Sequence, residues 1–215
     1  MRKILAEFLG TGLLVAFMIG SGIMATNLTK DVAVQLMMVA ASTALGLSVI
    51  IRILGPISGG HFNPAVTLVE LLSGSISTLN ALTYVITQTL GALSGAMLGN
   101  VMFEHSLIET SHSIKSGSNL LIGEVVATAG LILVIKMLVA HKNTEAIAFA
   151  VPAWIASAFF FTSSTSFANP AVTIGRTISD SFAGIAPESV VKFIAAQILG
   201  VLIAFGISKV LIDDK

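Results

Sequence analysis

The residues with the clearest chemical signal are two copies of one phrase. Asn-Pro-Ala-Val-Thr occurs at positions 63–67 and again at 169–173. Asparagine is a favoured N-cap and proline is favoured at the first helical position, so each copy predicts a short helix that begins after a loop. The residues expected to act together are Asn63, Pro64, Ala65, Asn169, Pro170 and Ala171.

Two facing helix starts would act electrostatically. A helix N-terminus carries about +0.5 elementary charge, and irregular backbone at membrane depth is tolerated only where it is buried or lines a wet cavity. Half-helices entering from opposite faces would join their N-termini near the midplane and repel cations and protons. The asparagine amides could then donate to a passing oxygen. The alternative is two unrelated helix caps in loops.

The composition indicates a membrane protein. Of 215 residues, 55% are hydrophobic and 10% are charged, against about 25% charged in soluble domains. Eleven acidic and eleven basic residues cancel, so no basic face for nucleic acid is expected, and zero cysteines exclude disulfides and thiolate chemistry. Six continuous apolar stretches predict spanning helices at 4–25, 32–54, 79–103, 120–140, 146–161 and 190–212.

The chain reads as a repeat. Each half contains a helix with a glutamate, an apolar helix, one Asn-Pro-Ala segment and a helix with a glutamine, with Gln88 25 residues after Asn63 and Gln197 28 residues after Asn169. Three spans per half is odd, so the second copy must enter from the opposite side. We therefore predict one all-α domain over 1–215, with inverted repeats at about 1–115 and 116–215 and polar, re-entrant segments at 55–73 and 163–179.

The sequence resembles the aquaporin and glycerol-facilitator (major intrinsic protein) family over essentially its whole length, with the closest match at Ser-Gly-Gly-His-Phe-Asn-Pro-Ala-Val-Thr, positions 58–67. The resemblance implies six membrane helices plus two half-helices, a pore in every subunit and a homotetramer. We expect no cofactor and no metal. The resemblance also implies an outer filter, which an ungapped count from the motifs assigns to Thr43, Ser157, Ser166 and Val172.

Val172 departs from the family pattern, because most relatives read Asn-Pro-Ala-Arg at this point. With neither that arginine nor an aromatic ring at the counted positions, we expect a wide, uncharged filter, as in arginine-lacking bacterial members. Arg176 follows one turn later and could place charge in the outer vestibule, although pairing with Asp180 or a lipid-facing position is the preferred expectation. His61 could brace the first loop or gate the inner mouth.

Charges inside spans need a reason. For Glu7 and Glu124 the preferred interpretation is that each carboxylate accepts hydrogen bonds from its re-entrant loop, and the alternative is a proton relay. Gln88 and Gln197 are expected to brace the same loops.

The expected function is a passive channel for water and small uncharged solutes such as glycerol-like polyols or arsenous acid. The alternatives are a strictly water-selective channel, a coupled secondary transporter and a structural junction protein. An enzyme is not expected, because the four histidines lie in scattered loops without metal-ligand spacing.

The positive-inside rule favours cytoplasmic termini, because seven basic residues then lie on the inner side of the membrane and four outside. The inner set is Arg2, Lys3, Arg52, Lys136, Lys142, Lys209 and Lys215. The short loops, with no evident cleaved presequence, lead us to expect a prokaryotic inner membrane. The segment 104–119 would be external. Glu7 argues against a cleaved signal at the N-terminus.

Overall fold

The computed structural model describes residues 1–212, so Lys215 of the orientation count and the last three residues of the predicted domain lie outside the described part. Six of its helices are long and apolar enough to cross a membrane. They are α1 (Arg2–Leu28), α2 (Val32–Ser58), α4 (Thr78–Val101), α5 (Ser118–Ala140), α6 (Ile147–Phe161, preceded by the 3-10 turn η1, Thr144–Ala146) and α8 (Pro187–Ile212). The all-helical prediction is confirmed.

Two short helices occupy the re-entrant segments. The first, α3, spans Pro64–Leu72, and the second, α7, spans Pro170–Gly175 and continues into the 3-10 turn η2 (Arg176–Ile178). The first re-entrant segment begins later than predicted, because α2 continues to Ser58. Helix α2 ends where Gly59 adopts the left-handed conformation, with φ of 96°. A residue in this conformation is a common end of a helix.

Small residues let the first and third long helices of each half cross closely. A Cβ on Gly95 of α4 would overlap the carbonyl oxygen of Gly12 in α1. In the second half, a Cβ on Gly200 of α8 would lie 2.8 Å from the carbonyl oxygen of Val125 in α5. Glycine therefore sets the separation of both pairs, as is common where membrane helices cross.

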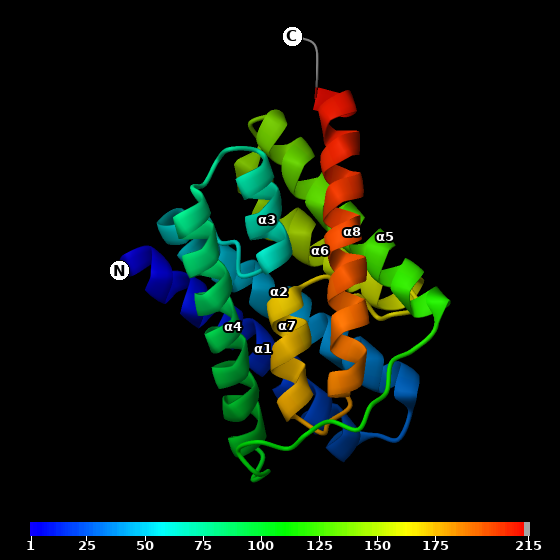
Figure 1. Cartoon of the computed structure of the whole chain (residues 1–215). Coiled ribbons are helices and arrows are strands. Elements are labelled where there is room, and N and C mark those ends of the chain that lie inside the picture. The colour runs from blue at the N-terminus through cyan, green and yellow to red at the C-terminus, as the bar shows by residue number, and fades with distance from the viewer. Residues whose placement is uncertain (213–215) are drawn as a thin grey trace.

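The half-helices bring the two repeats together at the centre. Figure 1 shows α3 and α7 arranged end to end between the long helices. α3 contacts α8 of the second repeat as well as α4 of its own, and α7 contacts α4 of the first repeat as well as α8. Each half-helix is thus held by both repeats, and this arrangement positions the site.

Candidate functional site

Asn63 and Asn169 join the two half-helices. The Asn63 Nδ2 donates to the carbonyl oxygen of Ala168 at 2.8 Å, and the Asn169 Nδ2 donates to that of Phe62 at 2.9 Å. Each Oδ1 caps its own helix, through the Ala65 amide in α3 and the Ala171 amide in α7. A carboxamide nitrogen carries two hydrogens, so each asparagine retains one N–H for a molecule in the cavity that both residues line.

The two carbonyl groups that accept these bonds lie in strained turns. Phe62 and Ala168, each directly before an asparagine, have φ of 46° and 47°. Positive φ is uncommon outside glycine, and such strain persists only where the surroundings impose it. The matching strain in both loops places each carbonyl oxygen toward the asparagine of the other half.

The carboxylate of Glu7 braces the first loop. Its Oε1 accepts from the hydroxyl of Ser58 at 2.7 Å and the amide of His61 at 3.0 Å. Its Oε2 accepts from the amide of Phe62 and from Gln88 Nε2, both at 2.7 Å. Four donors surround one fully buried carboxylate, which compensates the cost of burying its charge.

Glu124 repeats the arrangement in the second half. Its carboxylate accepts from the amides of Phe167 at 2.8 Å and Ala168 at 2.9 Å, and from Gln197 Nε2 at 2.7 Å. Gln197 also donates to the hydroxyl of Thr173 at 2.9 Å. Both carboxylates are therefore engaged by the loops, which is the geometry of a brace.

Two threonines belong to this network but were missed by sequence reasoning. Thr67 and Thr173 each donate to the carbonyl oxygen of the asparagine four residues earlier and accept from the glutamine of their half. The available signal was their position as the fifth residue of the repeated phrase.

The ring of His61 is held by the first half-helix. Its Nδ1 lies 3.0 Å from Thr67 Oγ1. When the hydroxyl hydrogen of Thr67 goes to the carbonyl oxygen of Asn63, His61 Nδ1 is the donor in this contact. The ring is edge-on to Tyr84, with centroids 5.2 Å apart. His61 lines both the central cavity and the wider hollows beside it.

The central cavity is narrow and mainly apolar. Its volume is about 50 Å³, which is room for a few water-sized molecules, since one water needs about 10–15 Å³ on this measure. Near His61, Gly60 and Val66 it adjoins a hollow of about 580 Å³ on the side of α3. The apolar walls come from several helices and include Leu14, Met18, Leu47, Leu131, Val151 and Ile155.

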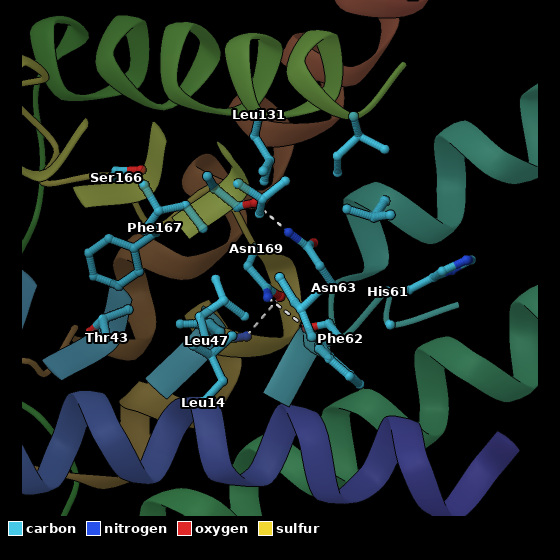
Figure 2. A pocket seen from close by; sticks show the side chains of 18 of the residues that line it. Leu14, Thr43, Leu47, His61, Phe62, Asn63, Leu131, Ser166, Phe167 and Asn169 are labelled. Carbon is cyan, nitrogen blue, oxygen red and sulfur yellow. Dashed lines mark hydrogen bonds between the residues drawn. The ribbon is translucent and has the colours of Figure 1, made fainter. Parts of the chain in front are cut away.

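The opposite end of the cavity holds two of the four residues counted as an outer filter, Thr43 and Ser166. Figure 2 shows Thr43, Ser166 and Phe167 at this end, His61 at the other, and Asn63 and Asn169 between them. Val172 also lines the cavity. The hydroxyl oxygens of Thr43 and Ser166 are buried, and among the described residues neither has a hydrogen-bond partner.

The prediction for Ser157 is wrong in this structure. Its side chain is exposed on α6, and the residues of α6 that line the cavity are Ile147, Val151 and Ile155. These three recur every fourth residue along one helix face, and Ser157 lies two residues past the last of them. Counting back from Asn169 crosses the loop between α6 and α7, so the count does not predict which side of α6 a residue lies on.

The width of the expected filter stays a prediction, but the structure adds an aromatic ring to it. Phe167, to which no role was assigned, lies among the lining residues. Thr43 is 0%, Ser166 1% and Phe167 2% exposed, whereas the His61 end of the cavity adjoins the hollow of about 580 Å³. The end at Thr43, Ser166 and Phe167 is therefore the narrow end of the cavity.

Arg176 neither pairs with Asp180 nor faces lipid, contrary to the preferred expectation. It is 3% exposed, and its Nε donates to the carbonyl oxygen of Ala183. Asp180 instead accepts from the amide and the ring of His112, both at 3.0 Å. Because Asp180 is held by the segment 102–117, it is not free to pair with Arg176.

The fold and the site together define a class of protein. Six spanning helices surround two half-helices whose capped N-termini meet at a narrow, mainly apolar cavity. This is the construction of a membrane channel rather than of a catalytic centre.

Comparison with known proteins identifies the family. Residues 1–146 match the family model described as major intrinsic protein. The chain is 41% identical over 212 residues to an aquaglyceroporin, AqpS, of Rhizobium meliloti, covering 99% of this chain and 91% of that protein. The chain belongs to the major intrinsic protein family, whose members are channels.

Two further similarities are weaker. The propanediol uptake facilitator PduF of Salmonella typhimurium is 36% identical over 115 residues, covering 53% of this chain and 43% of that protein. The X-ray structure of the aquaglyceroporin from Plasmodium falciparum matches with a TM-score of 0.76 at 20% identity, covering 98% of this chain and 96% of that one. That likeness concerns the fold.

Proposed function

We propose that this channel passes water and small uncharged solutes, with glycerol-like polyols as the main class and arsenous acid as a further candidate. The observation that carries the proposal is the lining of the narrow end. Thr43 and Ser166, whose hydroxyls have no partner among the described residues, lie there beside the ring of Phe167, and apolar Val172 lines the same cavity. A polyol presents hydroxyl groups and C–H groups side by side, so it can use both kinds of surface.

The central lining favours uncharged solutes. No aspartate, glutamate, lysine or arginine is among the residues that line the narrow cavity in the described chain, and two helix N-termini add positive potential at its middle. A cation that entered this cavity would lose its water ligands, and no carboxylate of the lining would replace them. The two buried carboxylates also argue against a coupled transporter, because Glu7 and Glu124 accept hydrogen bonds from the loops.

The similar proteins support the solute class. One is named an aquaglyceroporin and another a propanediol uptake facilitator, and both names refer to small polyhydroxylated molecules or to channels for them. We extend this class to the present chain because the unpartnered hydroxyls of its cavity fit it.

We propose a homotetramer in a prokaryotic inner membrane, with both termini cytoplasmic and the segment 104–119 external. Six spans put both ends of the chain on one side. Large apolar side chains are exposed on the outer faces of the long helices, as lipid or neighbouring subunits require; examples are Leu45, Val49, Leu82, Phe149, Phe160 and Val210. Cross-linking in membranes tests the assembly, and labelling of single introduced cysteines in intact cells tests the orientation.

The close packing around Phe167 favours one second candidate, a strictly water-selective channel. Stopped-flow light scattering on proteoliposomes separates the two candidates by comparing water, glycerol and arsenous acid with empty liposomes. We expect entry of water and glycerol well above background. Fast water movement without solute entry would instead identify the water-selective channel, and flux that follows an imposed proton gradient would identify a transporter.

A further inference from the structure

The ring of Phe167 is held on more than one side. The guanidinium carbon of Arg176 lies 3.6 Å from its centroid, and Phe193 meets it edge-on with centroids 5.2 Å apart. The backbone of Phe167 is also fixed, because its amide donates to Glu124. A ring with these contacts has little freedom to move out of the cavity wall.

The charge of Arg176 is buried with little compensation. Its Nε donates to the Ala183 carbonyl oxygen, while its Nη1 is buried and has no partner among residues 1–212. The carboxylate of Glu124 is taken up by loop amides and Gln197, and Asp180 is held by His112. Buried cations are normally paired with an anion. The guanidinium of Arg176 instead lies against the face of the Phe167 ring.

A second cation lies on the same ring. Nζ of Lys115, from the segment between α4 and α5, is 5.7 Å from the Phe167 centroid. Burial and the charge of Arg176 lower the pKa of Lys115 to about 8, so it carries its charge at neutral pH. Two cations therefore lie close to the residue that lines the narrow end of the cavity.

We propose that the stacked pair of Phe167 and Arg176 determines specificity at the narrow end, with the ring limiting solute size and the guanidinium behind it repelling cations. Arg176 does not line the cavity, so it acts as a positioning residue for the ring and as a fixed charge. This inference rests on the proposed function, since it concerns which uncharged solutes pass.

Four variants reconstituted in proteoliposomes separate the two roles. Phe167→Ala opens the wall, while Phe167→Leu retains most of its volume. Arg176→Gln removes the charge, while Arg176→Lys keeps it without the planar stack. Lys209→Gln is the matched control, because Lys209 Nζ lies 4.5 Å from the centroid of Phe205 on α8, a cation–π pair outside the cavity lining. Each variant is assayed for ethylene glycol, glycerol, erythritol and xylitol entry, and for potassium and proton leak.

We expect Phe167→Ala to raise erythritol entry about tenfold relative to glycerol, and Phe167→Leu to raise it less, because pore diameter and lining groups set selectivity. Arg176→Gln should raise the cation leak about tenfold and Arg176→Lys should restore the low leak. A structural role alone would change yield and thermal stability without moving the size profile or the leak.

The proposal is overturned if folded Phe167→Leu and Phe167→Ala both keep the parental size profile, or if the Arg176→Gln leak equals that of Arg176→Lys and of the Lys209→Gln control. If the parent passes only water and Phe167→Ala admits polyols, the solute proposal fails and this inference stands. If neither the parent nor any variant passes a polyol and the leak is unchanged, both fail.

Discussion

Asn63 and Asn169 are linked reciprocally, each donating from Nδ2 to the carbonyl oxygen of the strained residue directly before the other. The two half-helices therefore depend on each other for their position. The shared contact also aligns the remaining amide N–H groups in one cavity. A change in either asparagine acts on both repeats.

Replacing Asn169 should separate its two roles, the N-cap made by Oδ1 and the hydrogen bonds donated by Nδ2. Asn169→Ala removes the N-cap of α7 at a cost of about 1 kcal/mol and leaves the Phe62 carbonyl oxygen without its donor at a further cost of roughly 1–3 kcal/mol. Asn169→Asp keeps an acceptor for the α7 amides but removes both amide hydrogens and adds negative charge. Thermal unfolding should show a smaller loss for Asp than for Ala, and potassium leak a larger rise for Asp. An unchanged leak in Asn169→Asp would contradict the positive centre, and exposed Asn80→Ala serves as the control.

The brace formed by Glu7 predicts a stability effect rather than a coupling effect. Glu7→Gln places an amide group among four donors, so at least one donor loses its acceptor at a cost of about 1–3 kcal/mol. Thermal unfolding in detergent should show this loss, whereas Glu188→Gln at an exposed position should not. The rate of solute flux through the parent channel should not change when a proton gradient is imposed. A parental response that Glu7→Gln abolishes would favour the proton relay.

The close crossing of α1 and α4 predicts that one methyl group is costly. Gly95→Ala forces a Cβ against the carbonyl oxygen of Gly12, and overpacking of this kind costs about 1–3 kcal/mol. Gly206→Ala in α8 is the matched control, because no atom of the described part of the chain lies within 4 Å of the added Cβ and alanine is the better helix former by roughly 0.5–1 kcal/mol. Opposite shifts in melting temperature are expected. Equal shifts would mean that the helices can move apart freely.

The contact between His112 and Asp180 predicts a loss of local order in acid. The His112 amide and ring hold the pKa of Asp180 below its usual value, so the contact stabilises at neutral pH and is lost as pH falls through that lowered pKa. Hydrogen exchange of the His112 amide, corrected for its intrinsic rate, should therefore speed up in acid. The Ser111 amide donates to the Thr177 carbonyl oxygen at 2.8 Å, which does not titrate, and is the internal control. Asp180→Asn should remove the pH dependence, and persistence of that dependence would rule out Asp180 as its source.

Much of the architecture was predictable from the chain alone. Six apolar runs predict six helices because backbone groups in lipid must bond internally. Asparagine followed by proline predicts the half-helix starts, and the repeated phrase with three spans per half predicts the inverted arrangement. The roles of Glu7 and Glu124 as acceptors for loop amides could be anticipated because a carboxylate within a span needs donors, and the structure supplies those donors.

The narrow end of the cavity required the tertiary structure. Ser157 was assigned by counting, but helical phase directs Ile155 to the cavity and leaves Ser157 exposed. Arg176, at the start of η2, and Phe167, in the loop that precedes α7, stack across the length of α7, and their spacing along the chain does not predict that contact. The sequence by itself determined which helices form, since those depend on local bonding and apolar runs, and the inverted repeat stays a prediction. The lining and its charge were decided by side chains distant in sequence that only packing brings together.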